Sequence, residues 1–356
     1  MSSDISPRGA GLDLIGPAPR VDTELLATLT ASPVWRTTGD TPLARMWGLA
    51  PPPARVFGKL ESFNPGGSIK DRVVKSMFAK AVAAGEITRD TVVVESSSGN
   101  TAIGLAQLCA VAGLRLVCVV DPRTSSTNLE ILRAYGAEID MIHAPDPDSG
   151  EYLQARLRRV AELLETVPDS FWPNQYDNPA VIAAHVEGTL PEISRALSAP
   201  PDYLYCAVST CGTLLGCSKY LADNGWPTRL VAVDVMGSQI FARSPRTSRK
   251  FPGIGAPFAP PFADHADVWR VERVSDADCV AGCRAVASTS GILVGASSGA
   301  VVAAATRVIA ADPRPATHVL ILPDRGERYL DTVFGSRGIR GRTMSEHTGH
   351  RTDRTD

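Results

Sequence analysis

The lysine at position 70 stands in a setting that suits amine chemistry. It follows two adjacent glycines and a serine in the stretch FNPGGSIKDR, residues 63–72. The glycines allow a tight turn, the Ser68 hydroxyl is a candidate helix cap, and Lys70 then falls in the first helical turn. A positive charge is unfavourable at that end of the helix dipole, which favours a neutral amine able to form a Schiff base. Taken alone, the stretch also fits a surface lysine after an ordinary turn.

Three further loops place small or hydroxyl residues before a predicted helix. They read ESSSGNTAIGLA at 95–106, VSTCGTLLG at 208–216 and GILVGASSGAVVAAA at 291–305. A strand, such a loop and a helix N-terminus together make an anion site from backbone N–H groups, hydroxyls and the helix dipole. In any one loop the hydroxyls could do no more than cap the helix. Three loops together with Lys70, in this chain order, are much more specific.

The elements that must position these loops alternate between strand and helix patterns. Strands are predicted at residues 91–95, 115–121, 139–143, 203–208, 230–235 and 318–323. Helices are predicted at residues 100–112, 126–135, 152–167, 213–222, 276–289 and 298–311. The alternation predicts an α/β fold of parallel sheets covered by helices on both faces.

Composition excludes several classes of function. The 356 residues include 36 basic and 38 acidic ones, so neither nucleic acid nor a membrane surface is expected as the main partner. Seven cysteines without a CxxC pair indicate buried thiols and neither a metal site nor disulfides. No apolar run is long enough to cross a bilayer and no signal peptide is recognised, so a soluble, cytoplasmic protein is expected.

Together, the motifs resemble those of the pyridoxal-phosphate enzymes of the cysteine synthase and cystathionine β-synthase family, which have the fold called type II. The resemblance runs from about residue 41 to 331. It implies a homodimer whose subunit has two open, twisted, mostly parallel sheets, one in a large cofactor-binding domain and one in a small mobile domain. The expected bounds are 21–74 with 182–336 for the large domain, 75–181 for the small domain, and disordered ends at 1–20 and 337–356.

The resemblance also implies which residues bind pyridoxal 5'-phosphate. Lys70 would carry the cofactor as a Schiff base, Asn100 would hydrogen-bond its ring hydroxyl, and Ser297 would face its pyridine nitrogen. A serine there leaves that nitrogen largely unprotonated. The cofactor's phosphate would lie in the loop Ser209, Thr210, Cys211, Gly212 and Thr213.

The substrate carboxylate would be bound by residues of two separate motifs. The family's TSGNT loop corresponds to residues 97–101, with Ser97, Ser98 and Thr101 beside Asn100. The glutamine of the family's QQF/QY element corresponds to Gln175 in WPNQYDNP. These residues lie in the small domain, which would close over the substrate and exclude water.

The phosphate loop departs from the GTGGT pattern of cysteine synthases, because Ser209 and Cys211 replace two glycines. The added Ser209 side chain must face the substrate space, which indicates a different leaving group or nucleophile. Four other segments, CVVDPRTSSTNLEILRAYGAE, VDVMGSQIF, FPGIGAP and LPDRGERYLD, resemble a narrower branch, the N-(2-amino-2-carboxyethyl)-L-glutamate synthases. That branch joins O-phospho-L-serine to L-glutamate and releases phosphate, on the route to L-2,3-diaminopropionate.

An arginine gives a separate reason to expect a phosphorylated substrate. In EYLQARLRRVAELLETV, residues 151–167, Arg156 lies about 60° from the apolar stripe of the helix, whereas Arg158 is nearly opposite it. An arginine at the edge of a buried face needs an anionic partner, and a structural carboxylate is the alternative to a ligand. In the narrower branch this arginine, the tyrosine of NQY (Tyr176) and Ser209 recognise the phosphate of phosphoserine.

Rival functions remain open at this point. A cysteine synthase using O-phosphoserine or O-acetylserine with sulfide is the nearest enzyme, and a catalytically silent binding partner is the alternative from another class. Residues 237–249 and the PGIGA turn at 252–256 are the candidates for contacts to glutamate. A product of this kind could serve a siderophore or a non-ribosomal peptide antibiotic.

Overall fold

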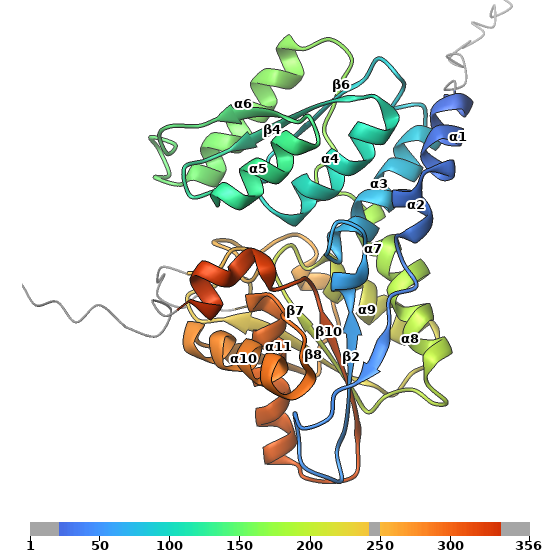
Figure 1. Ribbon diagram of the computed structural model, residues 1–356, viewed down its shortest axis with the longest axis vertical. Helices are drawn as coiled ribbons and strands as arrows, with labels where there is room; N and C mark the ends of the chain where they lie inside the picture. The colour runs from blue at the N-terminus through green and yellow to red at the C-terminus, as the bar shows by residue number, and fades with distance from the viewer. Residues whose placement is uncertain (1–20, 242–249, 336–356) are drawn as a thin grey trace, which may run out of the picture.

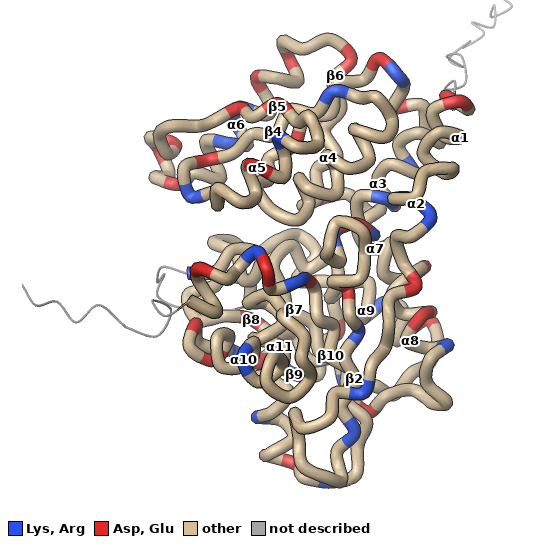
Figure 2. Tube along the Cα trace, in the orientation of Figure 1, with Lys and Arg blue, Asp and Glu red and all other residues tan. Residues whose placement is uncertain are grey.

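The computed structural model describes residues 21–241 and 250–335 (Figure 1). The two predicted disordered ends and most of the predicted glutamate-binding stretch at 237–249 lie outside these residues. No helix in the described part of the chain is long and apolar enough to cross a membrane. Basic and acidic residues alternate over both lobes of the molecule, in keeping with the near balance of charge (Figure 2).

In the described residues, ten strands form two sheets. The larger sheet has the order β1-β2-β10-β7-β8-β9, and all its pairs are parallel except β1 with β2. The smaller sheet has the order β5-β4-β3-β6 and is entirely parallel. The strand bounds are β1 Leu43–Arg45, β2 Arg55–Leu60, β3 Val92–Glu95, β4 Arg115–Val120, β5 Glu138–Met141, β6 Ser170–Phe171, β7 Tyr203–Ala207, β8 Arg229–Val235, β9 Arg270–Val274 and β10 Thr317–Leu322.

Helices cover both sheets. The α-helices are α1 Thr23–Ala31, α2 Pro33–Thr37, α3 Lys70–Ala83, α4 Asn100–Ala112, α5 Ser126–Ala134, α6 Tyr152–Thr166, α7 Ala180–Ala184, α8 Leu190–Ala196, α9 Gly212–Asp223, α10 Asp276–Ser290 and α11 Ala296–Ala311. Short 3₁₀ turns at Glu61–Phe63, Ala263–His265 and Glu327–Tyr329 and π-helical turns at His185–Thr189 and Leu330–Phe334 complete the chain. The predicted α/β class with two mostly parallel sheets is confirmed.

The two sheets have separate apolar cores. In the larger sheet one core packs against α10 and α11 and another against α8 and α9. The smaller sheet packs against α3, α4 and α5 on one face and α6 on the other. Leu25 and Leu29 of α1 belong to that smaller-sheet core, and Figure 1 shows α1 and α2 beside α3. The apolar face of α1 thus meets α4, whereas the prediction assigned residues 21–74 to the large domain.

All six predicted strands and all six predicted helices exist, within about two residues at each end. The patterns missed four of the described strands, β1, β2, β6 and β9, of which β1 and β6 have only three and two residues. Lys59 is buried within β2 because it pairs with Glu192 at 2.6 Å, so a charge interrupts the apolar run. Strand β9 is at the edge of its sheet and carries three charged residues, of which Arg270 is exposed, Arg273 half buried and Glu272 buried. Sequence pattern alone registers neither a buried ion pair nor an edge position.

Candidate active site

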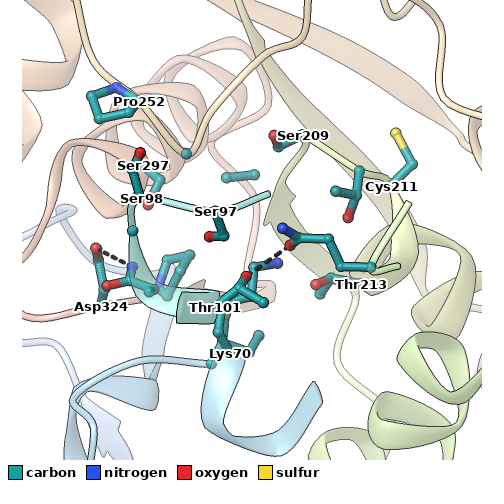
Figure 3. A pocket seen from close by; sticks show the side chains of 18 of the residues that line it. Lys70, Ser97, Ser98, Thr101, Ser209, Cys211, Thr213, Pro252, Ser297 and Asp324 are labelled. Carbon is teal, nitrogen blue, oxygen red and sulfur yellow. Dashed lines mark hydrogen bonds between the residues drawn. The ribbon is translucent and has the colours of Figure 1, made fainter. Parts of the chain in front are cut away.

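A cavity of about 230 Å³ opens between the two sheets (Figure 3). Its walls come from the loops that follow β3, β7 and β10, from the starts of α3 and α11, and from α6. These are the carboxyl ends of parallel strands, where open α/β sheets generally bind ligands. Every residue predicted to bind the cofactor, the substrate carboxylate or the phosphate of phosphoserine lines this cavity except Gly212. Of the described candidates for contacts to glutamate, Pro252 and Gly253 line it. Gly212 lies behind it, where a Cβ would come within 2.2 Å of Val181.

Lys70 is the first residue of α3, at the base of the cavity (Figure 3). The turn before it uses a left-handed Gly67, and the N–H of Gly66 donates to Asp71 at 2.6 Å. The prediction that Ser68 caps the helix is wrong: Ile69 occupies the cap position, although the Ser68 hydroxyl accepts from the Lys70 N–H at 3.2 Å.

The electrostatic setting of Lys70 favours a neutral amine. Burial lowers the pKa of Lys70, and the nearby Asp324 opposes that shift. The larger cause is therefore loss of water, whereas the sequence argument relied on the helix dipole. No hydrogen bond joins the Lys70 amine to any described residue.

The loop after β3 and the segment before α7 meet, as the resemblance implied. The Thr101 hydroxyl donates to the side-chain oxygen of Gln175 at 2.7 Å. The Ser97 hydroxyl accepts from the Ala102 N–H at 3.3 Å, and the Ser98 carbonyl accepts from Asn128 at 2.9 Å. Hydroxyl and amide groups from two distant segments thus face one part of the cavity.

Asn100 is held by residues that the sequence argument missed. Its Nδ2 donates to Asp324 Oδ2 at 2.9 Å, and Tyr329 donates to the same oxygen at 2.6 Å. Its Oδ1 accepts from Arg328, which also donates to the Gly66 carbonyl. Burial raises the pKa of Asp324. The segment LPDRGERYLD follows β10 directly, and that position was the available signal for a role at the site.

The loop between β7 and α9 is built tightly. Cys211 has φ +64 at the cap position of α9, a left-handed conformation that favours glycine. The first N–H groups of α9 have no partner within the helix. The Ser209 hydroxyl donates to the Gly255 carbonyl at 3.4 Å, at one end of the PGIGA turn. The Thr213 hydroxyl contacts the ring of His185, another residue that the sequence argument did not identify.

Ser297 and Ser298 lie inside the first turn of α11, so neither is its cap. The cap residue is Gly295, which has no side chain to cap the helix. Ser297 lines the cavity. The Ser298 hydroxyl is buried away from it, without a hydrogen-bond partner among the described residues.

Arg156 projects from α6 into the cavity with most of its side chain buried. Its Nε lies 3.4 Å from Asp121 Oδ2, so the structural carboxylate that was the alternative to a ligand is present. No hydrogen bond joins the guanidinium to any described residue. Arg158 is half exposed and pairs with Asp146.

Tyr176 and Ser209 line the same cavity as Arg156. Burial raises the pKa of Tyr176, so its phenol stays protonated and can donate a hydrogen bond. A cation and a phenol donor face one space, which suits an anion. The Ser209 hydroxyl lines the same space, but its proton is directed at the Gly255 carbonyl.

The chain is similar to known proteins over most of its length. A family model described as "Pyridoxal-phosphate dependent enzyme" matches residues 34–324. N-(2-amino-2-carboxyethyl)-L-glutamate synthase of Ralstonia nicotianae is 46% identical to the chain over 298 residues, which are 83% of this chain and 87% of that protein.

Solved structures of similar fold point the same way. The O-acetylserine dependent cystathionine β-synthase of Helicobacter pylori is 31% identical with a TM-score of 0.77, covering 84% of this chain and 97% of that one. O-ureido-L-serine synthase is also 31% identical with a TM-score of 0.77, over 88% and 96% of the two chains. The resemblance to the cysteine synthase family is confirmed.

Proposed function

Because the chain belongs to the family of pyridoxal-phosphate dependent enzymes, we propose that it replaces the phosphate of O-phospho-L-serine with the amino group of L-glutamate. The C–O bond at the β-carbon breaks and phosphate leaves with the bonding electrons. A C–N bond forms at the same carbon and the amine of glutamate gives up a proton. The products are N-(2-amino-2-carboxyethyl)-L-glutamate and inorganic phosphate. The name of the relative from Ralstonia nicotianae supports this reaction.

The described residues fit the cofactor. A half-buried lysine without a hydrogen bond from its amine to the described residues, the N-terminus of α9 and a neutral serine all face one cavity. Lys70 would hold the aldehyde, residues 209–213 the phosphate, Asn100 the ring hydroxyl and Ser297 the pyridine nitrogen. Bound there, the cofactor withdraws electrons from the α-carbon of the substrate, which makes its proton acidic.

Lys70 would serve as the base and acid for that proton. Burial already lowers the pKa of its amine, which favours the neutral form that could take the proton from the α-carbon and later return it. Ser97, Ser98, Thr101 and Gln175 would hold the substrate carboxylate through their hydroxyl and amide groups. We propose that residues 75–181 move as a small domain and exclude water when they close.

The observation that supports phosphoserine as donor is the state of Arg156. Its guanidinium lines the cavity, keeps only 14% of its side chain exposed, and forms no hydrogen bond with the described residues. A buried guanidinium whose donors remain free is costly unless a ligand satisfies them. Since Tyr176 and Ser209 line the same cavity, that ligand would be the phosphoryl group of phosphoserine. Phosphate would also leave more easily once its negative charge is stabilised.

Two further expectations belong to this proposal. The active protein would be a homodimer acting on small molecules alone, in the cytoplasm. Its product would be a precursor of L-2,3-diaminopropionate for a siderophore or a non-ribosomal peptide antibiotic.

A cysteine synthase reaction is the second candidate, favoured by the fold of the O-acetylserine dependent enzyme from Helicobacter pylori. Mass spectrometry of the products separates the two. Purified protein is incubated with phosphoserine and, in parallel, with glutamate, sulfide or homocysteine. We expect the glutamate adduct as the main product. Cysteine as the main product, with no glutamate adduct, would contradict the proposal, and no product with any nucleophile would favour a silent binding protein.

A further inference from the structure

His185 lies directly behind the loop of residues 209–213. It is fully buried and is the first residue of the π-helical turn His185–Thr189 that joins α7 to α8. Its Nε2 is 3.1 Å from the hydroxyl of Thr213, and its Nδ1 is 3.1 Å from the hydroxyl of Thr189. Both ring nitrogens therefore have a hydroxyl partner, and only Thr213 of these three residues lines the cavity.

The packing holds this ring in one place. A Cβ on Gly216, one turn beyond Thr213 on the same side of α9, would lie 2.7 Å from the Cβ of His185. Glycine at that position lets the π-helical turn approach α9 closely enough for the hydrogen bond. π-helical turns inside longer helices often occur at functional sites.

The imidazole is neutral, because burial and the nearby charges of Lys70 and Arg72 lower the pKa of His185 to about 3. A neutral imidazole has one donor and one acceptor nitrogen. If Nε2 accepts, the Thr213 hydroxyl donates its only proton to the ring in a hydrogen bond, and it can then only accept hydrogen bonds from groups in the cavity. If Nε2–H donates to Thr213, Nδ1 accepts a hydrogen bond from the Thr189 hydroxyl. The Thr213 hydroxyl can then donate its own proton in a hydrogen bond to a group in the cavity.

An anion in the cavity can accept a proton from Thr213 only in the second arrangement. We propose that His185 is a positioning residue, which donates through Nε2–H to Thr213 and so directs the Thr213 hydroxyl proton to the phosphate of the cofactor. This inference rests on the proposed placing of that phosphate in the loop of residues 209–213. The chain of donors runs from Thr189 through His185 and Thr213 to the ligand, and every group in it has a partner.

The test compares two ligands that differ only in the phosphate. The dissociation constants of pyridoxal phosphate and of pyridoxal are measured for the protein freed of cofactor, in the wild type, His185→Phe and His185→Gln. We expect His185→Phe to weaken pyridoxal phosphate about tenfold, a loss of ~1.4 kcal/mol, and to change pyridoxal less than twofold. His185→Gln keeps a donor near the Nε2 position and should recover most of the loss.

His318→Phe is the matched control. His318 is also buried and also contacts a hydroxyl, that of Tyr205 at 2.9 Å, but it does not line the cavity or contact its loops. Equal weakening of both ligands by His185→Phe, or the same selective loss in His318→Phe, would overturn the inference. A wild type that binds both ligands equally well would instead overturn the placing of the phosphate, and the inference with it.

A measurement on the wild-type holoenzyme does not depend on whether variants fold. Nitrogen-15 NMR of labelled histidine distinguishes a protonated from an unprotonated ring nitrogen. We expect the proton of His185 on Nε2 and none on Nδ1. A proton on Nδ1 would overturn the inference.

Discussion

Two largely buried arginines, Arg72 on α3 outside the lining of the cavity and Arg156 on α6 within it, show how differently the same side chain can be used. Arg72, on α3 two residues after Lys70, donates from all three guanidinium nitrogens, to Glu61, Glu192 and Thr41, at 2.6 to 3.1 Å. Arg156, on α6, has one ion pair of 3.4 Å and no hydrogen bond among the described residues. The first is satisfied by the protein, whereas the second still has donors for a ligand.

Their carboxylate neighbours follow the same division. Both oxygens of Glu61 accept hydrogen bonds, from Arg72, Thr41 and Asn64. Glu95, at the end of β3 near Arg156, accepts from Trp172 at 3.1 Å with one oxygen, and its other oxygen has no hydrogen-bond partner in the described residues. The groups around Arg72 therefore satisfy one another and support the fold. Arg156 and Glu95 retain hydrogen-bonding groups that the described residues do not satisfy.

Lys70 provides the severest test, because it shares α3 with Arg72 but faces the cavity. Lys70→Ala should lower turnover by on the order of 10³-fold or more. It should also remove the visible absorbance of the bound cofactor. The free energy of unfolding should hardly change, because the amine has no hydrogen bond in the described structure to lose. Phosphate release from phosphoserine and the melting temperature are measured together. A variant that releases phosphate at the wild-type rate would contradict the assignment of Lys70.

Arg72→Met should destabilise the protein by ~3–5 kcal/mol, because it leaves the buried charge of Glu61 uncompensated. The measurement is unfolding in urea followed by circular dichroism. Arg156→Met is the matched control and should cost no more than about 1 kcal/mol, since Asp121 still accepts from the Arg123 N–H. Equal losses of unfolding free energy in the two variants would contradict the distinction between Arg72, which the protein satisfies, and Arg156, which faces the cavity.

Arg156→Ala should lower kcat/KM for phosphoserine by ~30-fold or more, because a desolvated phosphate would lose a charged partner. O-acetylserine carries no phosphate dianion, so its turnover should change little. Both donors are assayed with saturating glutamate, beside Arg158→Ala as the control on the exposed face of α6. Equal losses on the two donors would mean that Arg156 only supports Asp121.

The smallest effect is a pH dependence at Glu95. Burial raises the pKa of Glu95 from 4.5 to about 7, so between these values the folded protein retains a proton that the unfolded chain has lost. The contribution of this group is therefore most favourable at low pH, and stability falls as pH rises from about 5 to 7. Glu95→Gln cannot lose a proton, so relative to wild type it should gain up to ~3 kcal/mol at pH 8 compared with pH 5.

Melting temperatures at pH 5 and pH 8 check this difference. The exposed Glu86→Gln on the same lobe is the matched control. A Glu95→Gln variant whose stability relative to wild type is the same at both pH values would show that Glu95 is charged, and balanced by Arg156, in the folded protein.

Local signals were enough for six of the ten described strands, for six of the eleven described α-helices and for the loops that line the cavity. The alternation of strand and helix patterns located six strands and six helices, and α4 begins at Asn100 as predicted. The glycine turn before Lys70 and the hydroxyl loops at helix starts were visible because such turns depend on residues only a few positions apart. The edge position of Arg156 on α6 likewise followed from helical periodicity.

What faces each of these residues was decided by tertiary structure. Asn100 meets Asp324 across 224 positions of the chain, and Thr213 meets His185 across 28. Asp121 reaches Arg156 because β4 ends beside α6. Periodicity shows which residues share a face of one element, but partners on different elements are chosen by how the sheets and helices pack. Because burial shifts the pKa of Lys70, His185 and Glu95, the charge of each group also depends on that packing.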